Sequence, residues 1–232
     1  MHIVLGSPLD YCNEWYFEEY CKFHLQYCKK LIIFYDDFKR KPLQETLEIA
    51  SKYNVDFNYI GEEFYETRVW KKVLEKCLTY KSDWVGLLAV DSILSDKFLN
   101  STNELFNSDA QWYGFPIFNF WEDYSHYRID GVWGAGRNVC LHTFLKVTSL
   151  NIDEYSFGDK KIHGSHFPDN LKSKNGCWIK YNPIVSDRES IIIKHMGYVK
   201  KDAWKERCIA RGNDYGRIDE QFGDVVLQKW EE

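Results

Sequence analysis

The chain has 232 residues, of which 44% are hydrophobic and 28% charged, so it is long enough to bury a substantial core as an ordinary globular protein. Its formal net charge of -5 argues against a surface that coats nucleic acid, because such surfaces usually carry a basic excess. The N-terminal apolar run is too short for a signal peptide and no later run is long enough to span a bilayer, so we expect a cytoplasmic protein.

The first half of the chain alternates strand-like and helical patterns. We expect strands at residues 2–7, 31–35, 55–60 and 84–90, and helices at residues 13–30, 42–50 and 65–80. In the last helix, for example, Trp70, Leu74 and Leu78 recur at helical spacing and are expected to face inward. Strands that alternate with helices predict an α/β, Rossmann-like, doubly wound parallel sheet.

The second half changes to aromatic, strand-like segments joined by turns that contain glycine. They cover residues 111–121, 127–133 and 138–145, and we expect them to extend the same sheet as a mixed sheet. A basic run follows, with a helix expected at residues 200–211. No internal repeat or proline-rich linker separates the halves, which favours one domain.

The cysteine pattern indicates reduced thiols. The seven cysteines form no Cys-x-x-Cys pair, and pairing them would leave one over, so a cytosolic compartment fits best. They are Cys12, Cys21, Cys28, Cys77, Cys140, Cys177 and Cys208.

Two side chains that can bind metal follow apolar strands far apart in the sequence. Asp91 comes after the strand at 84–90, and His195 comes after the apolar run at 191–194. Ligands of open α/β sheets bind beyond the carboxyl ends of the strands. A carboxylate oxygen and an imidazole nitrogen suit manganese or magnesium, and such an ion can hold a diphosphate. The pair therefore predicts a divalent-cation site.

A set of short motifs occurs in order along nearly the whole chain. The motifs are Asn13-Glu14, Asp36-Asp37, Asp83-Trp84, Ala89-Val90-Asp91-Ser92, Tyr127-Arg128-Ile129-Asp130-Gly131-Val132-Trp133 and Lys194-His195-Met196-Gly197-Tyr198. Their order resembles the family 2 glycosyltransferases, in particular the branch with a Trp-Val-x-x-x-Asp-x-Asp-Glu strand and a Lys-His-x-Gly-Tyr element. The resemblance implies the GT-A fold and transfer of a sugar from a nucleotide diphosphate donor with inversion at the anomeric carbon. It also implies one glycosyltransferase domain over residues 1–232, with a nucleotide-sugar-binding half at 1–108 and an acceptor-binding and metal or diphosphate half at 109–232.

The resemblance assigns donor-binding roles to particular residues. Asp36 corresponds to the residue that contacts the uracil or ribose of a UDP-type donor, although a helix N-cap or turn role is an equal alternative. Asp91 corresponds to the metal-binding Asp of the Asp-x-Asp motif and would bind the ion with His195. Ala89 replaces the first Asp, so the cation should bind weakly, or a Lys/Arg cluster should neutralise the diphosphate instead. Further donor contacts are expected at Ser7, Pro8, Arg68 and Lys200; Arg68 alternatively pairs with Glu66.

An inverting transfer needs one carboxylate to take the proton of the acceptor hydroxyl. Glu122 and Asp123 follow an aromatic strand and resemble the acidic pair at which many family members place this base. If they share a cleft, repulsion and burial should raise the pKa of one of them. Asp130 is the alternative base, and an exposed turn is the alternative role for the pair. Acceptor contacts are expected at Trp121, Arg128 and Trp133.

Other functions remain open at this stage. An inactive relative that binds nucleotide sugars without turnover would explain Ala89. A nucleotidyltransferase would usually need a pair of carboxylates that binds two metal ions and a Gly-rich loop that binds phosphate. We recognise neither motif in the sequence. The acceptor is a carbohydrate, a protein or a modified nucleic-acid base.

Overall fold

The computed structural model describes residues 1–131, 134, 139–149, 157, 176–179, 190–210 and 224–230. The contacts divide the chain into two units. The first unit consists of Met1–Val90, Ser101–Gly114 and Leu141–Trp178, and the second unit consists of Asp91–Asn100, Phe115–Cys140 and Ile179–Glu232. Each unit therefore combines segments from both halves of the sequence.

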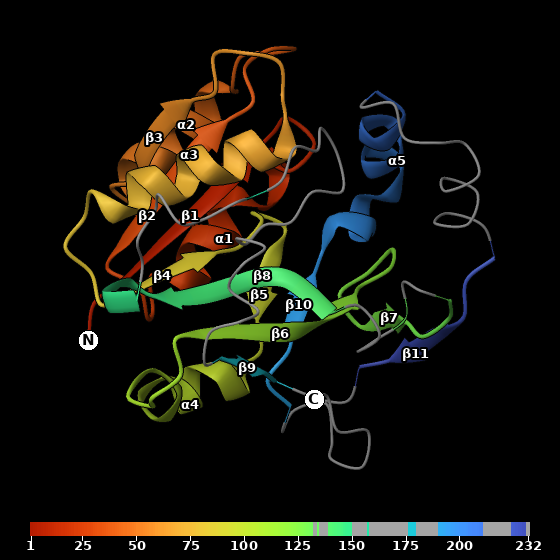
Figure 1. The fold of residues 1–232 in the computed structure, drawn as a ribbon. Helices are drawn as coiled ribbons and strands as arrows, with labels where there is room; N and C mark the ends of the chain where they lie inside the picture. The colour runs from red at the N-terminus through yellow and green to blue at the C-terminus, as the bar shows by residue number, and fades with distance from the viewer. Residues whose placement is uncertain are drawn as a thin grey trace. The chain divides into compact units, whose positions relative to one another are not determined.

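Parallel strands form the sheet of the first unit (Figure 1). They are β1 (Ile3–Leu9), β2 (Lys30–Tyr35), β3 (Asp56–Tyr59) and β4 (Trp84–Leu87), in the order β3-β2-β1-β4. β4 also pairs antiparallel with the end of β8 (Val139–Lys146), and β9 (Cys177–Trp178) pairs with the start of β6 (Trp112–Asn119). This mixed α/β sheet confirms the predicted fold class, including the parallel order of the N-terminal strands.

Helices cover both faces of this sheet. They are α1 (Phe17–His24), preceded by the short η1 (Glu14–Tyr16), α2 (Gln44–Lys52) and α3 (Glu66–Leu78). Gly6 and Ser7 are neighbours on β1, so they face opposite sides of the sheet. A Cβ atom on Gly6 would collide with side chains of α3, whereas the Ser7 hydroxyl shares a hydrogen bond with Tyr20 of α1. α1 and α3 therefore lie on opposite faces, as in a doubly wound sheet.

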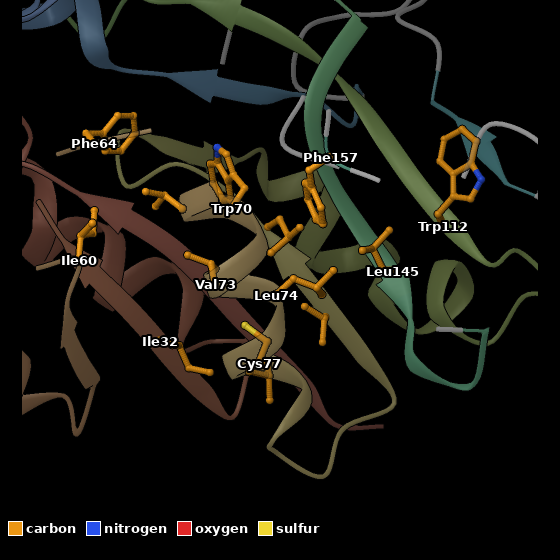
Figure 2. Packing of buried hydrophobic residues seen from close by; sticks show 14 residues of the cluster. Ile32, Ile60, Phe64, Trp70, Val73, Leu74, Cys77, Trp112, Leu145 and Phe157 are labelled. Carbon is orange, nitrogen blue, oxygen red and sulfur yellow. The ribbon is translucent and has the colours of Figure 1, made fainter. Parts of the chain in front are cut away.

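An apolar cluster of the first unit lies between α3 and the sheet. Figure 2 shows Trp70, Val73, Leu74 and Cys77 of α3 in this cluster, together with Ile32 of β2. Trp70 and Leu74 were predicted to face inward and are buried, and Leu78 is partly buried beside them. Burial of apolar side chains is the dominant favourable term in folding, so this cluster stabilises the packing of α3 against the strands of the first unit.

The second unit is built around a short central strand, β10 (Ile193–His195). β10 pairs antiparallel with β5 (Ser92–Leu94) on one side and parallel with the end of β6 on the other. A separate pair joins β7 (His126–Arg128) to β11 (Leu227–Lys229). Among the described residues, the second unit also contains η6 (Gly197–Lys200), α5 (Lys201–Ala210) and the start of α4 (Asp96–Phe106), whereas the short η2 (Val147–Ser149) belongs to the first unit.

Several element boundaries differ from the predicted ones. The helix expected at 13–30 ends at His24, and the strand expected at 84–90 ends at Leu87, after which the Leu88 N–H still donates to Gly6. The strand expected at 127–133 is β7, which ends at Arg128. The segment after Asp91 carried no prediction, although it forms β5 and α4. Short strands such as β5 have too few residues to show a clear period.

Two predictions about the whole chain concern its thiols and membrane spans. Cys12, Cys21, Cys28 and Cys77 are buried and unbridged in the structure, and their reduced state stays a prediction. Burial raises the pKa of the Cys21, Cys28 and Cys77 thiols, which makes them poor nucleophiles. Among the helices of the described segments, none combines the length and apolar character needed to cross a bilayer.

Candidate functional site

His195 occupies a fixed position at the end of β10 in the second unit. It is the register partner of Ser92 on β5 and of Asn119 on β6. Two further backbone bonds hold this point, because the Phe120 N–H donates to the His195 carbonyl at 2.9 Å and the Met196 N–H donates to the Asp91 carbonyl at 2.6 Å. The strand pairing therefore brings the segments of Asp91, Asn119 and His195 together.

The side chains of Asp91 and His195 meet at this point. Oδ2 of Asp91 lies 3.4 Å from Nε2 of His195, and the two residues are 0% and 9% exposed. The opposite imidazole nitrogen, Nδ1, lies 2.9 Å from Oδ1 of Asn119. The structure thus brings together the two residues predicted to bind metal and adds Asn119, which the sequence reasoning missed. The sequence offered one indication of a role for Asn119, which is its position near the end of the aromatic strand expected at residues 111–121.

The chemistry of this pair fits a shared divalent cation. Two ligands that are each about 2.1 Å from one ion lie roughly 3.0–4.2 Å apart, and the Asp91–His195 separation of 3.4 Å falls within that interval. In the parts of the chain that the structure describes, no group of three His, Cys, Asp or Glu side chains is arranged to hold an ion. An ion at this pair would therefore take further ligands from a phosphate or water, which magnesium-like ions do readily.

A hairpin next to β10 carries the predicted base residues. Phe120 and Tyr127 form an isolated antiparallel bridge, and the Trp121 N–H donates to the His126 carbonyl at 3.0 Å. Glu122 at the tip has φ 63° and is exposed, and its N–H donates to the Tyr198 carbonyl at 3.1 Å. A positive φ is costly for a residue with a Cβ atom and is found preferentially at functional sites. Glu122 is thus held in an unusual backbone conformation with its side chain towards solvent.

Asp123 is engaged in the turn of the same hairpin. Its Oδ1 accepts the N–H groups of Ser125 and His126 at 2.7 Å each, and its Oδ2 lies 2.8 Å from Nδ1 of His126. Desolvation alone would raise the pKa of Asp123, but the His126 ring and these N–H groups outweigh it and lower the pKa to about 2. The raised pKa expected for one of the acidic pair is therefore wrong for Asp123, because its partners are hydrogen-bond donors rather than the Glu122 carboxylate.

Asp130, the alternative base, forms an ion pair with a buried arginine. The Arg128 guanidinium donates to both carboxylate oxygens, with Nη2 at 2.7 Å from Oδ2, and the Val226 N–H donates to Oδ1 at 3.0 Å. The Arg128 hydrogen bond is the main cause that lowers the pKa of Asp130, which makes it a weaker base. The Arg128 side chain is only 3% exposed and lies over the Trp121 ring, whose face Tyr198 also stacks upon.

These contacts affect the predicted acceptor residues. Trp121 and Arg128 are both buried by neighbours within the second unit, so neither presents an open surface for stacking in this structure. Trp133 lies outside the described residues. The roles of these residues in acceptor binding stay predictions.

The first unit places acidic residues at the carboxyl ends of β1 and β2. Leu9 and Tyr35 are register partners, so the residues that follow them, Asp10 and Asp36, are neighbours across the two strands. They are 4% and 8% exposed, and the Asp36 N–H donates to the Leu9 carbonyl at 2.8 Å. Oδ1 of Asp10 accepts the Cys12 N–H at 3.1 Å. Sequence reasoning selected Asp36 but missed Asp10, although Asp10 follows the first strand in the same way.

The other predicted donor residues have different surroundings. The hydroxyl of Ser7 is completely buried and bonds to the Tyr20 hydroxyl and the Leu88 carbonyl, so it stabilises the first unit internally. Pro8 is half-buried on β1. Arg68 is exposed on α3 with its guanidinium 4.2 Å from the centre of the Tyr65 ring, and Lys200 is exposed at the end of η6.

Comparisons with known proteins show the fold. No family model and no curated protein matches the sequence. The S. aureus TarS fragment 1–349 aligns with a TM-score of 0.54 and 8% identity, covering 95% of this chain and 69% of that one. The same fragment in complex with UDP gives a TM-score of 0.52 at 8% identity with the same coverage.

A further S. aureus TarS structure aligns with a TM-score of 0.53 and 11% identity, where the match covers 95% of this chain but 42% of that one. HddC from Yersinia pseudotuberculosis reaches a TM-score of only 0.48, with 14% identity over 90% of this chain and 99% of that one. At these identities the alignments with TarS show a shared fold and not a shared activity. The chain has an α/β fold of the GT-A type.

Proposed function

We propose that this protein is a glycosyltransferase that moves a sugar from a nucleotide diphosphate donor to an acceptor hydroxyl, with inversion at the anomeric carbon. The observation that carries the proposal is the buried Asp91–His195 pair at the end of β10. Two pieces of support accompany it. The fold is that of TarS, which has been crystallised with UDP, and the first unit has acidic residues at the strand ends where α/β sheets bind ligands.

Asp91 and His195 would hold a manganese or magnesium ion. When bound, such an ion neutralises the charge that develops on the departing diphosphate, and this kind of stabilisation is usually the largest part of catalysis. Ala89 cannot add a carboxylate, so the ion is expected to bind weakly until the donor diphosphate contributes oxygen ligands.

In the first unit, Asp36 is proposed to bind the nucleoside. A ribose diol presents two O–H donors, and an ionised carboxylate accepts from both. The Asp36 N–H donates to the Leu9 carbonyl, and the Phe38 N–H lies 3.4 Å from Oδ1 of Asp36, so the residue is held at the end of β2. Asp10 beside it is a second acceptor of the same kind.

Glu122 is proposed as the general base. In the reaction, the acceptor oxygen forms a bond to the anomeric carbon while the bond from that carbon to the β-phosphate oxygen breaks, and the acceptor proton passes to a carboxylate. Asp123 and Asp130 are committed to His126 and Arg128, and their pKa values are lowered. Glu122 is exposed and has a positive φ, a costly backbone conformation found preferentially at functional sites, and these two features support its choice.

A thermal-shift series tests the proposal. UDP, GDP, CDP and ADP would each be added with and without manganese, because a ligand that binds only the folded state raises the melting temperature. At a concentration of about 100 Kd the stabilisation is about 2.7 kcal/mol, or roughly 5–10 °C for a chain of this size. We expect the largest rise with UDP and manganese. The absence of a rise with any nucleotide diphosphate would contradict the donor-site proposal.

Turnover separates an enzyme from an inactive relative. UDP release from UDP-sugars would be measured with carbohydrate, protein and nucleic-acid acceptors. Acceptor-dependent UDP release supports the transferase, whereas donor binding without release for any acceptor would favour an inactive nucleotide-sugar-binding protein.

A further inference from the structure

We propose that Asn119 is a positioning residue that fixes the tautomer of His195, so that the Nε2 lone pair faces Asp91. This inference deepens the proposed function and rests on it for the role of the cation. It concerns the uncharged form of the imidazole, in which one ring nitrogen carries a proton and the other carries a lone pair.

The strand register makes the contact between Asn119 and His195 specific. β6 and β10 run parallel, and Asn119 and His195 are direct register partners at the ends of their strands. Their side chains therefore stand on the same face of the sheet. The Phe120 N–H donates to the His195 carbonyl at 2.9 Å, which continues the ladder beyond the pair and prevents a slip.

The polar contacts then select one tautomer. Oδ1 of Asn119 is an acceptor and lies 2.9 Å from Nδ1 of His195, so Nδ1 must carry the proton for a hydrogen bond to form. Asn119 is 4% exposed, which makes a lost hydrogen bond at this point costly. With the proton on Nδ1, the neutral ring has its lone pair on Nε2, at 3.4 Å from Oδ2 of Asp91.

The resulting arrangement places two acceptor atoms opposite each other. A lone pair on Nε2 and a carboxylate oxygen repel each other in a buried environment, and a cation between them removes the repulsion. If Nε2 carried the proton, it would instead donate to Asp91 and block the metal-binding nitrogen. Asn119 thereby keeps the nitrogen nearest Asp91 available, as partners of metal-binding histidines generally do.

The first measurement uses the protein without any metal. The two ring-nitrogen chemical shifts of His195 distinguish the two uncharged tautomers from each other and from the charged ring, and they would be recorded over a series of pH values up to the alkaline range in which the uncharged signals are observed. A His195→Gln variant identifies the His195 signals among those of the other histidines. We expect the proton on Nδ1 in the parent protein and a shift towards Nε2 in Asn119→Leu, because leucine keeps the approximate volume but removes the acceptor.

The second measurement is titration with manganese alone. Loss of the partner of a metal-binding histidine typically weakens metal affinity about 10–100-fold, and we expect a loss in this range for Asn119→Leu. Asn119→Asp restores an acceptor for Nδ1–H and should recover the parent tautomer and at least the parent affinity. Phe118→Leu is the matched control, since Phe118 is a buried neighbour that faces the opposite side of β6. It should lower stability without changing the tautomer or the affinity.

The outcomes separate this inference from the proposed function. A proton on Nε2 in the parent protein, or an Asn119→Leu protein with unchanged tautomer and unchanged affinity, would overturn the positioning role. An equal loss in Phe118→Leu would also overturn it, because the effect would then be general destabilisation. A parent protein with the proton on Nδ1 that binds no manganese would instead overturn the metal part of the proposed function and leave the tautomer assignment supported.

Discussion

Oδ2 of Asp91 lies 3.4 Å from Nε2 of His195, although the two residues belong to segments that are far apart in the sequence. The contact exists because β5 and β10 pair antiparallel with Ser92 opposite His195, which places Asp91 next to the end of β10. Both side chains are almost completely buried, so the charge on the Asp91 carboxylate is costly without compensation, which is the role proposed for the cation. The relationship leads directly to the first prediction.

Removal of either ligand should abolish the manganese-dependent part of donor binding. In Asp91→Asn and in His195→Ala, we expect manganese to add nothing to the melting temperature measured with UDP, while the smaller rise with UDP alone persists. Asp36→Asn is the matched variant for the nucleoside, and it should lower the rise both with and without manganese. If Asp91→Asn and His195→Ala keep the full manganese effect, the ligand assignment is wrong.

The second prediction distinguishes Glu122 from Asp123 as the general base. Glu122→Gln should lower the transfer rate about 10²–10⁴-fold, the usual contribution of a general base, with donor affinity unchanged. Asp123→Asn should retain most of the rate, because Asp123 supports the turn through Ser125 and His126. The reverse pattern, with activity lost only in Asp123→Asn, would assign the base to Asp123, and activity in both variants would direct attention to Asp130.

The third prediction concerns the acid sensitivity of the hairpin. The pKa of Asp123 is lowered to about 2 in the folded protein, whereas an unfolded aspartate has a pKa of about 3.9. A depressed folded-state pKa stabilises the hairpin above about pH 4, and this contribution is lost as the pH falls towards about 2. Because the side chain is 48% exposed, the effect should be local rather than global.

Nuclear magnetic resonance can follow this local change. The backbone N–H signals of Ser125 and His126, which donate to Asp123, should titrate with a midpoint near pH 2. They should show no such titration in Asp123→Asn. A midpoint near pH 4 in the parent protein would mean that these hydrogen bonds do not hold the carboxylate in solution.

The fourth prediction tests the close approach of α3 to β1. In Gly6→Ala the added methyl group would collide with Val73 and Cys77, so we expect a loss of about 1–3 kcal/mol, the usual cost of overpacking. This corresponds to a decrease in melting temperature of roughly 2–4 °C per kcal/mol. Gly61→Asn is the control, because Gly61 has φ +72°, which asparagine tolerates, and open space around its Cβ position. A Gly6→Ala protein as stable as the parent would show that α3 can shift at little cost.

The sequence alone determined the elements whose signal is local. Apolar runs and helical spacing gave β1 to β4 and α3, since a strand or helix of several residues must present an apolar face to the core. The same reasoning identified Asp91, His195 and Asp36 as residues at strand ends. It also gave the α/β class, because strands that alternate with helices have few other ways to pack.

Only the tertiary structure decided which of these residues contact one another and which hydrogen-bond partners each side chain has. Asn119 contacts His195 because β6 and β10 pair in one particular register, and register depends on packing between distant segments rather than on local sequence. For the same reason, only the folded chain shows that Ser7 contacts Tyr20 and that Asp123 contacts His126. Residue type and position along a strand therefore indicated the candidate residues. Their burial and hydrogen-bond partners, which depend on the folded chain, determine whether each side chain can act as a ligand or as a base.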